Sequence, residues 1–468
     1  MTSDDAGLAT GALRGAQRLI ARPEALKLAL VAARRWRGRI VYAIGDQGCA
    51  SVANFLLTIL YAAWLPLDGF GRYVVVWTIS LLIESFQISL IMDPLPATVS
   101  RFGRRNRARI DVAGTWVVLL YGGATSLLIL AALPAVALWA PQFVAPLACL
   151  VLVNPFQRLY IFFRRLCYIR DRQDAASVAS MGYAFTLIAG AFALNGLGLL
   201  SVPAAVLLWG LANGVAIVAI YAQGLARLNA PPVATVAWLA RRLWRAGRWL
   251  TGSAIGYWIT NWGVFPIVGA MAGLQTAGIL RALQNIFTPV IQFNAALNLA
   301  ILPRVADKIV AVGQHYARTF AFYGSALFLG IVFVYGTVVL SEAETILGLI
   351  YRKPEILAST HLLWPFACGM VVESARQASS MALLAAGRTR VFFLARLAGI
   401  TVFVTGAFVL TRFIGFEGVL WASVIADAVA AGALISELFR IKPGAKGANA
   451  APDRNLTAAQ DAVGTPLS

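Results

Sequence analysis

Charged side chains are scarce in this sequence, and their scarcity excludes an ordinary soluble protein. Only 13% of the 468 residues are charged, whereas 60% are hydrophobic, and the mean hydropathy is +0.75. A typical soluble domain carries about 25% charged residues and roughly 45–50% apolar ones. The composition therefore predicts a polytopic membrane protein with an all-α fold.

Cysteine is also rare, and no pattern for a metal or a nucleotide is present. The four cysteines have no metal-ligand or redox spacing and lie in or beside apolar segments, where cysteine usually behaves as a small hydrophobe. The phosphate-binding loop GxxxxGK[ST] is absent as well. We expect no disulfide, no metal site, no cofactor and no direct use of ATP.

The net charge of +19 does not indicate nucleic-acid binding, because the sequence contains no soluble domain that could carry a basic surface. Nucleic-acid binding would need a basic stripe with interleaved aromatic residues, and the sequence offers none, so no nucleic-acid partner is expected. No isolated apolar region with a small-residue cleavage site precedes residue 40, so no cleaved signal peptide is expected either.

Apolar segments of membrane-spanning length recur along the chain. Each is near the twenty residues that cross the hydrocarbon core. Twelve such segments are predicted, at 41–64, 73–93, 112–139, 143–163, 177–199, 203–222, 249–271, 277–302, 318–340, 358–386, 391–411 and 416–438. Lys and Arg collect in alternate connections, around Arg104, Arg170, Arg245, Lys308 and Arg388. The other connections are nearly uncharged, except that SEAETILGLIYRKPE, residues 341–355, carries several charges of both signs. The positive-inside rule then places both termini in the cytoplasm.

The chain contains an internal duplication. The stretch from Gly45 to Arg101 recurs at Gly252 to Lys308 without a gap, at an offset of 207 residues. Asn54 returns as Asn261, Gly71 as Gly278 and Pro96 as Pro303. Glycine and proline are constrained by the backbone, so these matches outweigh chance matches of Leu or Ala.

The duplication predicts two six-helix bundles of the same orientation, related by a pseudo-two-fold axis along the membrane normal. The predicted parts are a basic cytoplasmic segment at 1–40, a bundle at 41–223, a cytoplasmic linker at 224–248, a second bundle at 249–438 and a disordered cytoplasmic tail at 439–468. The basic segment is expected to form an amphipathic helix on an anionic membrane surface, or a partly ordered tail.

Polar residues inside the spans form stripes at helical spacing. Each must face a partner helix or a cavity rather than lipid. Stripes on five helices predict a common polar interior, although such residues also join neighbouring helices. The predicted cavity residues are Asn54, Gln87, Tyr257, Asn261, Arg281, Gln284, Asn285 and Arg376.

Charged residues within spans mark function because burying charge in a bilayer is costly. Glu84, Glu373 and Asp46 are candidates for ion coupling. Glu373 and Arg376 also have the spacing of an ion pair across one helical turn, Arg281 lies where it could snorkel to the surface, and Asp46 lies where it could act at the membrane interface.

Three stretches resemble a known family. Residues 277–306, AGILRALQNIFTPVIQFNAALNLAILPRVA, are similar to the eighth-helix signature of bacterial polysaccharide-biosynthesis membrane proteins. Residues 45–62 resemble the opening helix of that family, and residues 154–173 resemble the end of its fourth helix. These proteins are oligosaccharide flippases of the superfamily that also includes the MATE exporters.

The resemblance implies a fold and a cargo. It implies two bundles around a V-shaped cavity that opens alternately to either side, and a polyprenyl-pyrophosphate-linked oligosaccharide, a precursor of exopolysaccharide, O-antigen or capsule, as cargo. It also implies a bacterial inner-membrane location among membrane lipids, beside a polysaccharide polymerase and glycosyltransferases of the same pathway. Arg281 and Arg376 suit the pyrophosphate, whereas amides and aromatic rings suit the sugars.

Two other functions are compatible with parts of the sequence. A MATE-type, cation-coupled exporter of small organic molecules shares the architecture but would favour an acidic cavity without arginines. An enzyme acting on the same glycan lipid usually needs a large outer loop for its catalytic groups, and every predicted outer loop is short. We therefore expect a transporter and not an enzyme.

Overall fold

The computed structural model is helical throughout its described part, which comprises residues 23–99, 104–225, 229–294, 297, 301, 305, 308–309, 315–385 and 390–440. The predicted tail from residue 441 onward, the first 22 residues and Pro303 lie outside these ranges. No strand occurs within them. The prediction of an all-α polytopic membrane protein is confirmed.

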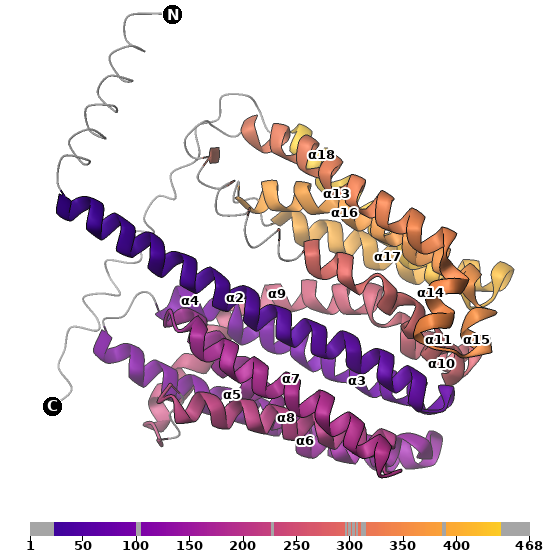
Figure 1. Ribbon diagram of the computed structural model, residues 1–468, viewed down its shortest axis with the longest axis horizontal. Helices are drawn as coiled ribbons and strands as arrows, with labels where there is room; N and C mark the ends of the chain where they lie inside the picture. The colour runs from indigo at the N-terminus through magenta and orange to yellow at the C-terminus, as the bar shows by residue number, and fades with distance from the viewer. Residues whose placement is uncertain are drawn as a thin grey trace, which may run out of the picture.

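The N-terminal lobe gathers the first half of the chain, coloured indigo to magenta in Figure 1. Its elements are α2 (Pro23–Trp64), α3 (Leu67–Gln87), the π-helix η1 (Ile88–Met92), α4 (Pro94–Val99), α5 (Arg104–Trp139), the 3-10 helix η2 (Pro141–Phe143), α6 (Val144–Ile169), α7 (Gln173–Gly196) and α8 (Val202–Ala222). The predicted basic segment is thus helical from Pro23 and continuous with the first span.

The C-terminal lobe holds the second half (Figure 1). Its elements are α9 (Val233–Asn261), α10 (Val264–Ala272), α11 (Leu274–Ile286), α13 (His315–Ser341), α14 (Ala343–Ile350), α15 (Pro354–Leu357), the 3-10 helix η3 (Thr360–Leu362), α16 (Leu363–Ala385), α17 (Arg390–Ile414) and α18 (Glu417–Phe439). Helix α9 begins just after Pro232, so most of the predicted linker 224–248 is helical.

Nine helices in the described residues are long and apolar enough to cross a membrane. Two of the other predicted spans are interrupted by proline. Pro266 has no N–H to donate to Trp262, where α9 ends, and Pro289 has none for Asn285, beside which α11 ends. The third, predicted at 358–386, begins with the 3-10 helix η3 and continues as α16, which ends at Ala385.

The two lobes meet through contacts that the duplication relates to each other. In one, the Trp258 indole N–H donates to the Thr78 carbonyl at 2.8 Å, from α9 to α3. In the other, the Asn285 amide donates to the Phe55 carbonyl at 3.4 Å, from α11 to α2. Thr78 and Asn285 are separated by 207 residues, the offset of the repeat. Each lobe therefore uses the same position of its second helix to contact the first helix of the other lobe.

Candidate functional site

A cavity of about 490 Å³ lies between the two lobes. Its walls come from α2, α3, α6, α7 and α8 on one side and from α9, α10, α11, α16 and α18 on the other. Most of the lining side chains are polar or aromatic. The predicted residues among them are Asn54, Glu84, Tyr257, Asn261, Arg281, Gln284, Asn285 and Glu373.

Arg281 is held between two tryptophans in this cavity. Its guanidinium carbon lies 4.3 Å from the ring centroid of Trp77 and 5.7 Å from that of Trp262. The two indoles meet edge to face, with centroids 5.1 Å apart. One guanidinium N–H donates to Gln284 Oε1 at 2.5 Å. Arg281 is therefore fixed inside the protein rather than reaching the membrane surface.

The charge of Arg281 is not balanced by a carboxylate. Among the described residues no Asp or Glu oxygen lies within 4.0 Å of its guanidinium, and only 8% of the residue is exposed. A guanidinium has five N–H donors, so the bond to Gln284 leaves most of them available. A buried cation stabilised mainly by aromatic faces is suited to an anionic ligand.

Asn54 and Asn261 occupy equivalent places in the two lobes. Both line the cavity, and the repeat relates one to the other. Each amide donates to the carbonyl four residues earlier, Ala50 for Asn54 at 2.9 Å and Tyr257 for Asn261 at 3.2 Å. The internal bonds aim the amide oxygens, and the Asn54 oxygen accepts from the Tyr183 hydroxyl at 3.3 Å.

The carboxylates of the cavity differ in their partners. Glu373 is bonded to Arg376 in the next turn of α16, through Nε at 2.9 Å and Nη2 at 2.5 Å. Glu84 lines the N-terminal side, and no cation lies within ion-pair distance of it in the described part of the chain. The ion pair that the spacing of Glu373 and Arg376 suggested is therefore formed, whereas Glu84 faces the cavity unpaired.

Three of the predicted site residues lie outside the cavity lining. Gln87 is fully buried inside the N-terminal lobe, where its amide donates to the Arg158 carbonyl at 2.7 Å. Arg376 lies behind Glu373. Asp46 is fully buried among residues of its own lobe. Helical spacing placed Gln87 and Arg376 on polar faces whose other members, Glu84 and Glu373, do line the cavity, so a shared face does not determine what each residue contacts.

Asp46 is the centre of a buried network. It accepts bonds from Arg164 Nε at 3.0 Å and Nη2 at 2.8 Å, from the Tyr168 hydroxyl at 2.5 Å, and from Ser180. These donors come from α6 and α7, whereas Asp46 lies on α2. The carboxylate therefore ties three helices together, and all its hydrogen-bonding capacity is occupied within the N-terminal lobe.

Sequence reasoning missed a second charged pair and a buried arginine. Arg396 of α17 lies 3.6 Å from Asp427 of α18, and its guanidinium lies 5.0 Å from the Tyr257 ring centroid. Asp427 lines the cavity, whereas Arg396 lies behind it. Arg158 of α6 is fully buried and donates to Ser80 at 3.1 Å. The available signal was a charged residue within an apolar span, since Arg158, Arg396 and Asp427 all fall inside predicted spans.

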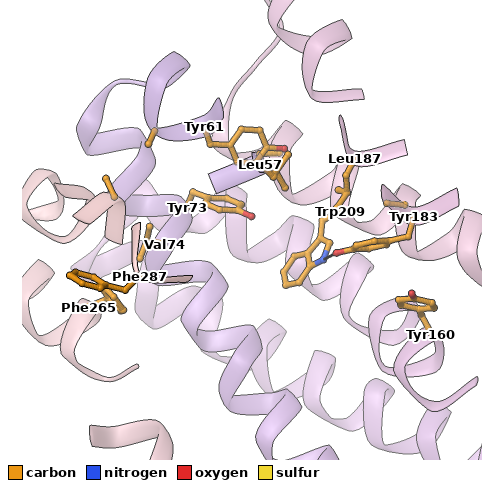
Figure 2. Packing of buried hydrophobic residues seen from close by; sticks show 14 of the residues in the cluster. Leu57, Tyr61, Tyr73, Val74, Tyr160, Tyr183, Leu187, Trp209, Phe265 and Phe287 are labelled. Carbon is orange, nitrogen blue, oxygen red and sulfur yellow. Dashed lines mark hydrogen bonds between the residues drawn. The ribbon is translucent and has the colours of Figure 1, made fainter. Parts of the chain in front are cut away.

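Aromatic residues close the N-terminal side of the cavity. Figure 2 shows Trp209 of α8 against the Tyr183 hydroxyl, to which its indole N–H donates at 3.0 Å. Tyr160 stacks on Tyr183, with ring centroids 5.5 Å apart. Tyr160, Tyr183 and Trp209 are all among the lining residues. This side of the cavity thus combines flat apolar rings with hydroxyl groups.

Solved structures of membrane transporters share the fold of this chain. No protein-family model and no curated protein sequence matches the chain. An inward-facing MATE family multidrug transporter of the MOP superfamily superposes with a TM-score of 0.73 at 13% identity, covering 86% of this chain and 100% of that one. The lipid II flippase MurJ in an inward closed conformation superposes with a TM-score of 0.62 at 12% identity, covering 86% of this chain and 88% of that one.

A MOP superfamily transporter from Pyrococcus furiosus also matches, with a TM-score of 0.62 at 11% identity and coverage of 86% and 95%. At these low identities the superpositions show a shared fold alone, and they show it over most of each chain. The expected likeness to the superfamily of flippases and MATE exporters is thereby confirmed at the level of structure. The chain has the fold of the MOP superfamily, which those MATE transporters and MurJ share.

Proposed function

We propose that this protein is a flippase that moves a polyprenyl-pyrophosphate-linked oligosaccharide across a bacterial inner membrane by alternating access. The observation that carries the proposal is Arg281, a cation in the cavity between the lobes with no carboxylate partner among the described residues. A pyrophosphate would supply the missing negative charge and accept several N–H donors at once.

The rest of the cavity suits the sugars of such a cargo. Sugar hydroxyls need both donors and acceptors, which Asn54, Asn261 and Asn285 supply. Sugar rings also present apolar faces, and the indoles of Trp77 and Trp262 lie beside Arg281. The polyprenyl tail would remain in the bilayer. The MurJ structure, whose fold this chain shares, is described as that of a lipid II flippase.

An exporter of organic cations is the second candidate function. The observation that favours it is the acidic middle of the cavity, where Glu84, Glu373 and Asp427 all contribute to the lining. Glu373 and Asp427 are already paired with arginines, which leaves Glu84 to attract a cation. The multidrug MATE transporters have the same fold. Arg281 would repel such a cargo, and we therefore rank this function second.

Ligand binding separates the two candidates. Native mass spectrometry of the full-length protein in detergent would be titrated with undecaprenyl pyrophosphate, with neutral undecaprenol and with tetraphenylphosphonium. We expect the pyrophosphate to bind most tightly. Losing charged hydrogen bonds of about 1.5–3 kcal/mol should make Arg281→Gln bind it roughly 10- to 100-fold more weakly. Arg281→Lys should lie between, because lysine keeps the charge but not the planar fork.

Arg412→Gln is the control, since Arg412 lies over Phe408 and outside the cavity lining. It should bind all three probes as the wild type does. Preferential binding of tetraphenylphosphonium, lost in Glu84→Gln and kept in Arg281→Gln, would support the cation exporter instead. Transport itself is tested by accumulation of a lipid-linked glycan on the inner leaflet of a deletion strain. Glycosyltransferases of the same pathway would make this glycan, and a polymerase would use it after translocation.

A further inference from the structure

Two glycines that the repeat relates to each other meet at one end of the molecule. They lie near the first turns of α3 and α11, where the connections are short and nearly uncharged (the outer end). A Cβ atom on Gly71 would lie 1.8 Å from the Leu274 carbonyl oxygen. A Cβ atom on Gly278 would lie 2.8 Å from the Leu67 carbonyl and 3.1 Å from the Gly71 nitrogen. The two helices therefore cross backbone against backbone.

The glycines are required by this approach and not by their backbone conformation. The positive-φ glycines of the described residues are Gly198, Gly224, Gly273 and Gly415, so Gly71 and Gly278 have dihedral angles that other residues adopt. Real Cβ atoms essentially never approach carbonyl oxygens to under 3.0 Å, and backbone cannot move aside as a side chain can. Any side chain at either position must push the two lobes apart.

This crossing forms the outer wall of the cavity. Phe70 and Tyr73, on either side of Gly71 in α3, both line the cavity, and Arg281 lies three residues after Gly278 in α11. Figure 2 shows Val74 of α3 beside Phe265 and Phe287 of the other lobe, which continue the apolar contact inward. Opening the crossing would thus connect the cavity with the outer end.

A lysine reinforces the same closure. Lys353, in the turn between α14 and α15, donates from Nζ to the Leu65 carbonyl of the N-terminal lobe at 2.5 Å. Leu65 follows α2 directly, two residues before α3 begins. The first-span glycines of the repeat behave differently. Gly45 approaches Ser177 of its own lobe, and Gly252 approaches Phe393 of its own lobe. The matched glycines Gly71 and Gly278 therefore join the lobes at the outer end, whereas Gly247 of α9, whose Cβ atom would lie 2.6 Å from the Ser89 carbonyl oxygen, joins them at the other end.

We propose that Gly71 and Gly278 are the outer gate of the cavity, held shut by the Lys353–Leu65 hydrogen bond. This inference rests on the proposed function in one respect: a transporter requires its cavity to open toward the outside. Gly278 and Arg281 both belong to α11. Separation of the two glycines would therefore also move Arg281, the residue proposed to bind the pyrophosphate. The gate and the binding site would then change together.

A single cysteine in the cavity reports whether the gate is closed. Ser423→Cys, in a background without the four native cysteines, places a thiol of similar size in the lining. The full-length protein in right-side-out vesicles is treated with a membrane-impermeant maleimide. With Gly71 and Gly278 intact, labelling should be slow. Gly71→Ala and Gly278→Ala should each label roughly tenfold faster, the factor to which about 1.4 kcal/mol corresponds.

Gly196→Ala is the matched control, because Gly196 lies at the outer end of α7 with open space around its Cβ position. It should label as slowly as the parent. Lys353→Met removes the hydrogen bond without adding bulk between the helices, and should give a smaller acceleration. Folding of each variant is checked by its size-exclusion profile. If one glycine variant does not fold, the other glycine variant and Lys353→Met still test the proposal.

Equal labelling of the parent, both glycine variants and Lys353→Met would overturn the proposed gate. Equal acceleration by Gly196→Ala would overturn it too, because the effect would then be general loosening. The labelling needs no cargo, so it is independent of the proposed function. Accelerated labelling in a protein that binds no undecaprenyl pyrophosphate would retain the gate and remove the proposed cargo.

Discussion

Replacing Asp46 tests whether this buried carboxylate is structural or couples transport to an ion. Asp46 is fully buried, and Arg164 and two hydroxyl groups donate to it. Removing one partner of a buried ion pair typically costs about 3–5 kcal/mol, because the other charge remains in a poorly solvating environment. The unpaired hydroxyls of Tyr168 and Ser180 would each add up to ~1–3 kcal/mol, although such losses are not additive.

We therefore expect Asp46→Ala to destabilise the protein by about 3–5 kcal/mol. At about 2–4 °C per kcal/mol for a unit of 150–250 residues, the Tm of the detergent-purified protein should fall by roughly 6 °C or more. Asp68→Ala is the matched control, since Asp68 is 58% exposed and pairs with Arg72 on the same helix. An exposed pair of this kind contributes less than about 1 kcal/mol, so its Tm should barely move.

The double variant Asp46→Leu with Arg164→Met sharpens the test. Replacing both members of a buried pair with apolar residues is often neutral, so most of the lost stability should return. A Tm for Asp46→Ala equal to that of the wild type would refute the structural reading. So would a stable Asp46→Asn protein whose transport no longer depends on an ion gradient, since the carboxylate would then be needed for coupling alone.

Two further predictions concern topology and the ion pair of α16. In a cysteine-free background, Glu344→Cys should react with an impermeant thiol reagent from the outside and Arg245→Cys only from the inside; outside labelling of Arg245→Cys would contradict the two-lobe orientation. Arg376→Ala should deplete folded protein from the membrane because Glu373 loses its bidentate partner, and adding Glu373→Ala should restore abundance. Continued depletion in the double variant, measured by immunoblot of the membrane fraction, would assign Arg376 a role beyond this pair.

Nine of the twelve predicted spans correspond to described helices long and apolar enough to cross a membrane, whereas the continuity of the other three was predicted wrongly. Hydropathy over about twenty residues records composition and ignores which backbone groups find partners. The segments predicted at 249–271 and 277–302 are both interrupted four residues before a proline, at Trp262 and beside Asn285. Pro266 and Pro289 were only a partial signal. A proline inside a helix removes the bond to the fourth preceding carbonyl, yet α5 and α6 continue through Pro134 and Pro155.

Helical periodicity predicted which residues share a face, but it could not say what that face meets. The stripe on the second span includes Trp77, Glu84 and Gln87. The first two line the cavity, whereas Gln87, the last residue of α3, is buried and donates to the Arg158 carbonyl of α6. A polar stripe covers a range of directions around its helix, so its members can contact different neighbours.

The internal duplication identified residues at equivalent positions of the two halves, and some of these residues lie close together in the structure. Sequence comparison matched Gly71 with Gly278 and Asn54 with Asn261 as related positions in separate halves. The structure brings the glycines into contact and places both asparagines in one cavity. That outcome follows from the pseudo-symmetry, because residues near a two-fold axis face their own counterparts. Which matched residues lie near the axis depends on helix tilt, which the sequence does not specify.

The distribution of charge along the cavity favours the outer end as the place where an anionic headgroup binds. In the middle, Arg376 and Arg396 lie behind Glu373 and Asp427, so an approaching phosphate would meet carboxylates first. Only Arg281 presents an unbalanced positive charge to the cavity among the arginines that the structure describes there, since Arg164 is paired with Asp46. A phosphate drawn to Arg281 would then lie one helical turn from Gly278, and the energy of binding would act directly on the helix that closes the outer gate.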